Sequence, residues 1–167
     1  MIIKGKVWKY GDDINTDVIF PGKYTYTVLE PSEMAKHAME DLDPDFASNV
    51  KPGDVIVAGK NFGCGSSREQ AATALKALQI GAIVAKSFAR IYYRNAINQG
   101  IPVIQCPEVV DAVEKGEELE IDMEKGEIKT QSGKVFKFSP LPDYVLGIVK
   151  DGGLIPHLKK TLKGGSE

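Results

Sequence analysis

Short apolar runs alternate with helix-like segments through the middle of the chain. Three runs have the length and composition of buried strands: residues 54–58, 80–85 and 102–104. The segment after the glycine-rich stretch 59–65 carries apolar side chains on one helical face. Residues 88–98 show the same pattern, and Gly100 is placed to end that second helix. Because strands and helices alternate in this way, we predict a parallel sheet flanked by helices.

The two ends of the chain follow other patterns. Residues 2–8 alternate like a strand, the turn formers of residues 11–17 predict a loop, and residues 32–41 predict a short helix with Ser32 as its N-cap. Further on, short strands joined by glycine turns are expected before a final helix, at residues 118–122, 127–130, 134–138 and 143–150. We therefore predict a mixed α/β fold with a parallel sheet core flanked by helices and additional short antiparallel strands.

One compact domain is expected over residues 1–167, with a frayed tail at 163–167. The 21 basic and 23 acidic residues give a net charge of -2, whereas nucleic-acid binding usually needs clustered Lys and Arg. No segment approaches a membrane span, and the charged N-terminal stretch does not resemble a signal peptide. The expected partners are small molecules or proteins, not nucleic acid or membrane, and the expected compartment is the cytoplasm.

Residues that commonly hold metals are scarce. Cys64 and Cys106 are too few and too far apart for a metal finger or a disulfide framework, and the chain has only two histidines. No metal or other cofactor is therefore expected in this chain alone. Arg90 and Arg94 lie four apart on one predicted helix face. They are interpreted as structural support, with the glycine-rich loop, a partner protein or surface acids as the alternative contacts.

The glycine-rich loop at residues 61–70 lies between a predicted strand and a predicted helix, where open α/β sheets usually bind ligands. Ser66 and Ser67 each precede Glu or Gln by three positions, so two capping boxes overlap, and one serine is expected to cap the helix while the other points outward. A helix N-terminus favours an anion, and Arg68 adds a fork that matches a carboxylate.

The glycine-rich loop does not match three familiar motifs of similar composition, because required residues are missing from it. Arg68 stands where a dinucleotide fingerprint starting at Gly63 needs glycine, and Glu69 stands where a nucleophile elbow centred on Ser67 needs glycine. A P-loop also needs a Gly-Lys-Ser/Thr ending, which this loop lacks. The remaining alternative is an ordinary capped helix that follows a glycine turn.

Three segments together resemble enzymes of the aconitase superfamily. Residues 61–70 resemble the Gly-Ser-Ser-Arg-Glu loop of that family's swivelling domain, residues 15–21 its N-terminal Thr-Asp motif, and residues 87–95 its Ser-Phe helix motif. The order and spacing agree, and the resemblance covers nearly the whole chain. It implies the swivelling-domain fold.

The resemblance also implies half of an active site. In such enzymes a larger partner subunit holds a 4Fe-4S cluster, which acts as a Lewis acid on the leaving hydroxyl. The resemblance assigns the base to Ser66 and carboxylate binding to Ser67 and Arg68, with Asp17 orienting Arg68 or a substrate hydroxyl. The implied reaction is dehydration and rehydration of a small hydroxy diacid, in assembly with the large subunit, and self-association of this chain is left open.

The expected substrate depends on Tyr26. Relatives that take tricarboxylic acids carry arginine at the aligned position, where its fork can hold the additional carboxylate. Tyr26 instead offers an apolar ring with one hydroxyl, which suits a branched alkyl group. Isopropylmalate, an intermediate of leucine biosynthesis, is therefore the first choice. The alternatives are homoaconitate, for which Lys23 could supply a point charge, and a noncatalytic binding or regulatory module, such as one for RNA.

Overall fold

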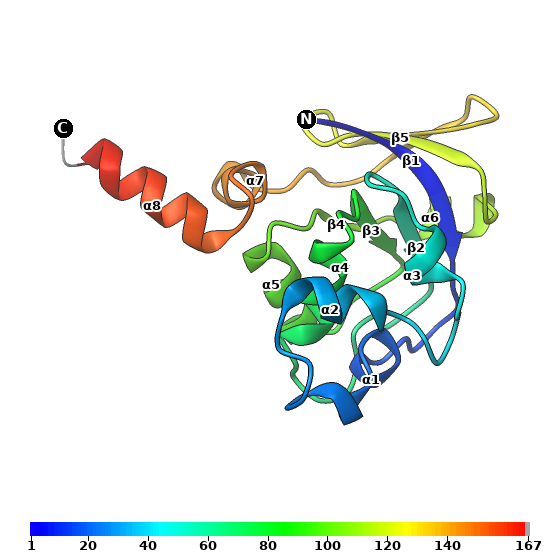
Figure 1. Ribbon diagram of the computed structural model, residues 1–167. Coiled ribbons are helices and arrows are strands. Elements are labelled where there is room, and N and C mark those ends of the chain that lie inside the picture. Colours follow the sequence, from blue (N-terminus) through cyan, green and yellow to red (C-terminus); the bar gives the residue numbers. More distant parts are fainter. Residues whose placement is uncertain (166–167) are drawn as a thin grey trace.

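A computed structural model describes residues 1–165 of this 167-residue chain. Its centre is a seven-stranded sheet with the strand order β4-β3-β2-β1-β5-β6-β7 (Figure 1). The strands are β1 (Ile2–Lys9), β2 (Val55–Ala58), β3 (Ala82–Ala85), β4 (Val103–Gln105), β5 (Glu118–Asp122), β6 (Glu127–Thr130) and β7 (Val135–Lys137).

Half of the sheet is parallel. Strands β1 to β4 pair in sequence order, with Val7 opposite Val55 and Ile56 opposite Ile83. Every residue of β2 and β3 is buried. This agrees with their unbroken apolar sequences, which predicted strands that are covered on both faces. The predicted parallel core is confirmed.

The other half is an antiparallel meander. Strand β5 pairs antiparallel with β1, and β6 and β7 follow as consecutive antiparallel neighbours. In β5, Leu119 and Ile121 are buried while the residues on either side of each are not, which is the period-two pattern of a sheet with one covered face. The prediction of a mixed α/β fold is therefore confirmed.

The helices fill the connections between strands. They are α1 (Thr16–Ile19), η1 (Gly22–Tyr24), α2 (Pro31–Lys36), α3 (Phe46–Asn49), α4 (Gln70–Ala77), α5 (Arg90–Asn98), α6 (Pro107–Ala112), α7 (Asp143–Lys150) and α8 (Leu154–Gly165). Helix α4 packs against α2 and α5, and α6 packs against β3. Helix α5 ends as predicted, because Gly100 takes a positive φ of 83° directly after its C-cap.

Two predictions near the N-terminus are wrong in detail. Residues 11–17 are not all loop, since the Asn15 side chain accepts a hydrogen bond from the Val18 N–H and caps the one-turn helix α1. Helix α2 begins at Pro31, with Glu30 rather than Ser32 as its N-cap. Proline's fixed φ suits the first helical position, so it sets the start of the helix.

The chain ends in a helix that the hydrophobic pattern did not predict. Helix α8 extends away from the sheet at the side of the molecule opposite α1 (Figure 1). Gly152 and Gly153 separate α8 from α7, and Pro156 lies within its first turn, where proline is tolerated. Residues 163–165 of the predicted frayed tail belong to α8, and residues 166–167 lie outside the described part, so fraying stays a prediction.

Candidate active site

The three motif segments meet at one edge of the sheet. The loops that contain residues 11–15, 59–69 and 86–89 follow the carboxyl ends of β1, β2 and β3, which are neighbours in the sheet. Isolated parallel bridges, Asn15 with Cys64 and Phe62 with Phe88, continue this order beyond the strands. The carboxyl edge of a parallel sheet is where α/β proteins usually bind ligands. The fold therefore gathers sequence-distant motifs into one site.

Thr16 attaches the glycine-rich loop to α1. Its hydroxyl donates a hydrogen bond of 2.7 Å to the Ser66 carbonyl, and its N–H donates one of 2.9 Å to the Cys64 carbonyl. The Thr16 side chain is buried, with 3% of the residue exposed. Because both bonds reach main-chain atoms, they fix the path of the loop and leave its side chains available. Thr16 stands inside the Thr-Asp motif, but no role was predicted for it from the sequence.

Gly63 sets the close approach of the loop to α5. It has a positive φ of 84°, and a Cβ atom built there would lie 2.2 Å from Cγ of Tyr92. Tyr92 is buried, and its hydroxyl donates a 3.1 Å hydrogen bond to the Ala71 carbonyl. Only glycine fits this combination of φ and space. The loop is thereby held between the aromatic ring and α1.

The predicted capping boxes are wrong. Helix α4 begins at Gln70, and its N-cap Glu69 makes no side-chain capping bond. The Ser66 carbonyl is held by Thr16, and the chain takes several further residues to enter the helix. The hydroxyls of Ser66 and Ser67 have no hydrogen-bond partner within residues 1–165, and both residues are exposed. Both hydroxyls are thus available to a ligand.

Arg68 and Asp17 form an ion pair across the site. The distance between Arg68 Nη1 and Asp17 Oδ1 is 2.6 Å, with the arginine side chain 20% exposed and the aspartate side chain 61% exposed. The contact lacks hydrogen-bond geometry, and Nη1 is shielded from solvent without a hydrogen-bond partner among residues 1–165. A buried donor without a partner is uncommon in folded proteins. Asp17 is the charge partner of this nitrogen, and the other donors of the fork make no hydrogen bond within residues 1–165.

Gly22 makes room for this ion pair. A Cβ atom at Gly22 would lie 2.5 Å from Arg68 Nη1 and 2.7 Å from Asp17 Oδ1. A side chain there would displace one partner or the other. Gly22 begins η1, so the segment after the Thr-Asp motif passes directly over the pair. No local sequence pattern identifies Gly22 as part of the site, because its contact with Arg68 depends on tertiary structure.

A cavity of about 210 Å³ opens between the loops. Its lining combines the glycine-rich loop with the first turns of α5: Thr16, Gly63, Gly65, Ser66, Ser67, Arg68, Ala89, Arg90, Ile91, Tyr92 and Asn95. Three of the predicted site residues are thus brought together here, and Asp17 reaches the site through Arg68. Asn95 belongs to the Ser-Phe motif, but no role was predicted for it from the sequence.

Tyr26 lies apart from this cavity. It is 89% exposed and is absent from the residues that line the cavity. A ring this exposed does not pack beneath the loop. Tyr24, two residues earlier, stacks on His37 at a ring distance of 3.9 Å, so the segment is anchored just before Tyr26. The role of Tyr26 in substrate choice stays a prediction.

The two cysteines do not form a metal site. Cys64 is partly exposed in the glycine-rich loop, whereas Cys106 is buried, and burial raises the pKa of its thiol. Within residues 1–165, no three side chains of His, Cys, Asp or Glu are grouped to hold a metal ion. Two separate thiols do not fit a cluster that needs three thiolates. Likewise, no helix in the described part of the chain is long and apolar enough to cross a membrane.

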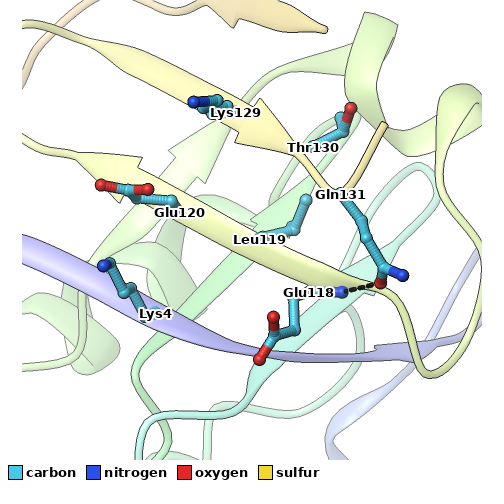
Figure 2. A pocket seen from close by; sticks show the side chains of 7 residues that line it. All are labelled: Lys4, Glu118, Leu119, Glu120, Lys129, Thr130 and Gln131. Carbon is cyan, nitrogen blue, oxygen red and sulfur yellow. Dashed lines mark hydrogen bonds between the residues drawn. The ribbon is translucent and has the colours of Figure 1, made fainter. Parts of the chain in front are cut away.

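A second hollow, of about 220 Å³, lies on the antiparallel half of the sheet (Figure 2). Lys4, Glu120 and Lys129 follow one another across β1, β5 and β6, so opposite charges alternate on neighbouring strands. At the end of the hollow, the Glu118 N–H donates a 3.0 Å hydrogen bond to Gln131 Oε1. Cross-strand charge pairs of this kind stabilise a solvated sheet face. This hollow therefore needs no ligand to explain its residues.

Comparison with known proteins defines the class of this fold and site. Residues 14–109 match the family described as the Aconitase C-terminal domain. The matched region contains the parallel strands β2 to β4 and all three motif loops. The superfamily predicted from the three motifs is confirmed.

Individual relatives narrow this class. The chain is 54% identical over 164 residues to the 3-isopropylmalate dehydratase small subunit of Caldicellulosiruptor bescii, and the aligned region covers 98% of each chain. It is 52% identical over 163 residues to the isopropylmalate/citramalate isomerase small subunit of Methanocaldococcus jannaschii, covering 96% of both. A crystal structure of 3-isopropylmalate dehydratase from the same archaeon superposes with a TM-score of 0.93 at 48% identity, covering 99% of this chain and 98% of the other. This chain therefore belongs to the family of 3-isopropylmalate dehydratase small subunits.

Proposed function

We propose that this chain is the small subunit of a two-chain hydro-lyase that interconverts 2-isopropylmalate and 3-isopropylmalate in the cytoplasm, as a step of leucine biosynthesis. The observation that carries the proposal is the cavity at the carboxyl edge of the sheet, which combines Ser66, Ser67 and Arg68 in a chain 54% identical to a named small subunit. A cationic fork beside two free hydroxyls suits a small hydroxy diacid.

Ser66 is proposed as the base. In the dehydration direction its oxygen takes the proton from the carbon next to the one that loses hydroxide, and it returns a proton to carbon on rehydration. The Ser66 hydroxyl is exposed in the cavity and has no hydrogen bond to another described residue. A serine is a weak base at its ordinary acidity, so the positive charge of Arg68 must favour the deprotonated oxygen.

Arg68 and Ser67 are proposed to bind a substrate carboxylate. Asp17 holds one nitrogen of the guanidinium at 2.6 Å, which fixes the direction of the fork. That nitrogen is Nη1, which is shielded from solvent, so a carboxylate would pair with the remaining donors of the fork, which make no hydrogen bond within the described chain. Asp17 is therefore a positioning residue in this proposal, because it acts through Arg68.

The cavity supplies the proton acceptor and the carboxylate site, but no group suited to act on the leaving hydroxyl. We place the 4Fe-4S cluster, which would supply that Lewis acid, on a large subunit that docks over the cavity. The donor set of this chain agrees with that division, since Cys64 and Cys106 cannot provide three thiolates. Each subunit then contributes half of the reacting groups.

The name of one relative favours a second substrate besides isopropylmalate. The 52% identical archaeal relative is named an isopropylmalate/citramalate isomerase small subunit. Citramalate is also a hydroxy diacid and differs in its smaller alkyl group. The assay that tests the proposal compares turnover of isopropylmalate, citramalate and homoaconitate by this chain mixed with the large subunit. Preference for the tricarboxylic homoaconitate would contradict it.

Replacing Tyr26 with arginine is expected to shift the preference toward homoaconitate. The new fork would pair with the additional carboxylate that the tyrosine hydroxyl leaves without a charged partner. One charge-assisted hydrogen bond is worth about 1.5 to 3 kcal/mol, so the ratio of kcat/KM values should change by roughly 10- to 150-fold. The measurement is kcat/KM for both acids in the reconstituted enzyme.

Tyr144→Arg is the matched control for this substitution. Tyr144 is 67% exposed on α7, and it does not line the cavity. Its replacement adds the same charge to the chain and should leave the substrate ratio unchanged. An unchanged ratio in Tyr26→Arg would remove Tyr26 as the selector.

A further inference from the structure

A groove lined by arginine continues from the active-site cavity along α5. The arginine groove, defined by Phe88, Arg90, Tyr93, Arg94 and Gln105, has a volume of about 550 Å³ and is open to solvent. Arg90 also lines the active-site cavity, so the two hollows share one side chain. The groove therefore begins at the edge of the proposed site.

The two arginines of the groove have no acidic partner among residues 1–165. Arg90 and Arg94 are exposed, and neither forms an ion pair or a side-chain hydrogen bond with another residue in the range 1–165. Nearby Lys86, by contrast, forms an ion pair with Asp111 at 2.8 Å. Like charges four apart on a helix repel each other. Two neighbouring cations thus remain uncompensated although the chain has more acidic than basic residues.

The groove also has the composition of a protein interface. The chain has 21 basic residues but only three arginines, and two of those three line this groove. Phe88 and Tyr93 pack edge to face at a ring distance of 5.8 Å, which gives the groove a rigid aromatic wall. Ile91, one position after Arg90, is 56% exposed and lines the adjoining active-site cavity. Arginine and aromatic side chains are enriched where proteins bind one another.

We propose that the arginine groove is a docking surface for an acidic segment of the large subunit. This inference rests on the proposed function, because a subunit that completes the cavity must approach its rim, which Arg90 borders. Arg94 lies one helical turn further along α5 and lines the groove but not the active-site cavity, so it contacts the partner and not the substrate. Carboxylates of the partner would pair with both guanidinium forks.

The test measures binding of the large subunit to Arg94→Glu, by sedimentation or calorimetry under anaerobic conditions. Reversal of one charge in the groove should raise the Kd by at least about tenfold at low salt, since like charges across an interface are strongly unfavourable. At saturating large subunit, kcat and KM should stay within about twofold of the wild type, because Arg94 does not line the cavity. Raising the ionic strength should narrow the difference in Kd between the variant and the wild type.

Two further variants separate charge from folding. Lys134→Glu makes the same change in the exposed β6–β7 turn, away from the groove, and should bind the large subunit like the wild type. Arg94→Gln removes the charge without reversing it and should weaken binding by a smaller factor than Arg94→Glu. If circular dichroism shows that Arg94→Glu does not fold, the Kd of Arg94→Gln for the large subunit tests the docking surface instead.

Normal binding by Arg94→Glu or, where that variant does not fold, by Arg94→Gln would overturn the docking surface alone. So would a change confined to the substrate KM, since the groove would then face the substrate. If the wild-type chain itself does not bind the large subunit, the proposed function fails together with the docking surface. The two failures are therefore distinguishable by the behaviour of the wild type.

Discussion

Replacing Ser66 with alanine is expected to lower the kcat of the reconstituted enzyme by roughly 10²- to 10⁴-fold, the usual contribution of a positioned acid or base. The substitution removes only the hydroxyl. The contact that holds the loop is the bond from Thr16 to the Ser66 carbonyl, and alanine keeps that carbonyl. KM and the affinity for the large subunit should therefore change little, because the lost interaction matters chiefly in the transition state.

Ser139→Ala is the matched control. Ser139 is exposed, makes no hydrogen bond to another described residue and lies outside the active-site cavity. The kcat of the reconstituted Ser139→Ala enzyme should equal that of the wild type. Steady-state kinetics with isopropylmalate measure both variants at saturating large subunit. A near-normal kcat in Ser66→Ala would show that another group takes the proton, and the assignment of the base would have to be abandoned.

Arg68→Lys is expected to lower kcat/KM by roughly 10- to 100-fold, mostly through a higher KM. Lysine keeps the charge but offers a point charge instead of a planar fork, so one ammonium cannot serve both Asp17 and a carboxylate in the same geometry. Hydrogen bonds to charged groups are worth about 1.5 to 3 kcal/mol, which corresponds to this range. The effect should appear with every diacid substrate, because each of them presents the carboxylate.

Arg94→Lys provides the control for this exchange. It makes the same chemical change on α5 outside the cavity, so kcat/KM at saturating large subunit should stay at the wild-type value. If Arg68→Lys retains wild-type kcat/KM, the fork does not bind the substrate carboxylate. The contact between Arg68 and Asp17 would then be a structural ion pair.

The sequence was most informative where local pattern and tertiary structure agree. The apolar runs of β2 and β3 are buried on both faces, so their composition alone identified them. Ser66, Ser67 and Arg68 are consecutive, and they lie in the loop that follows β2 at the edge of the sheet. The proximity of Asp17 and Arg68 followed from the family resemblance, and the ion pair at 2.6 Å agrees with it.

Other features depend on contacts between distant residues. The capping boxes were predicted from local spacing alone. In the structure the Thr16 hydroxyl donates a hydrogen bond to the Ser66 carbonyl, 50 positions away in sequence, and helix α4 begins only at Gln70. Gly22 leaves space for an ion pair that no local pattern reveals. Helix α8 was missed because two glycines and a proline, which usually end helices, surround its start.

The most direct test of the central claim measures hydro-lyase activity of this chain and the large subunit, each alone and mixed under anaerobic conditions. The claim is that the cavity of Ser66, Ser67 and Arg68 is half of an active site. We expect this chain alone to be folded, colourless and inactive, and isopropylmalate to be turned over only in the mixture. Turnover by this chain alone, or a mixture that forms a complex without turning over isopropylmalate, would contradict the account.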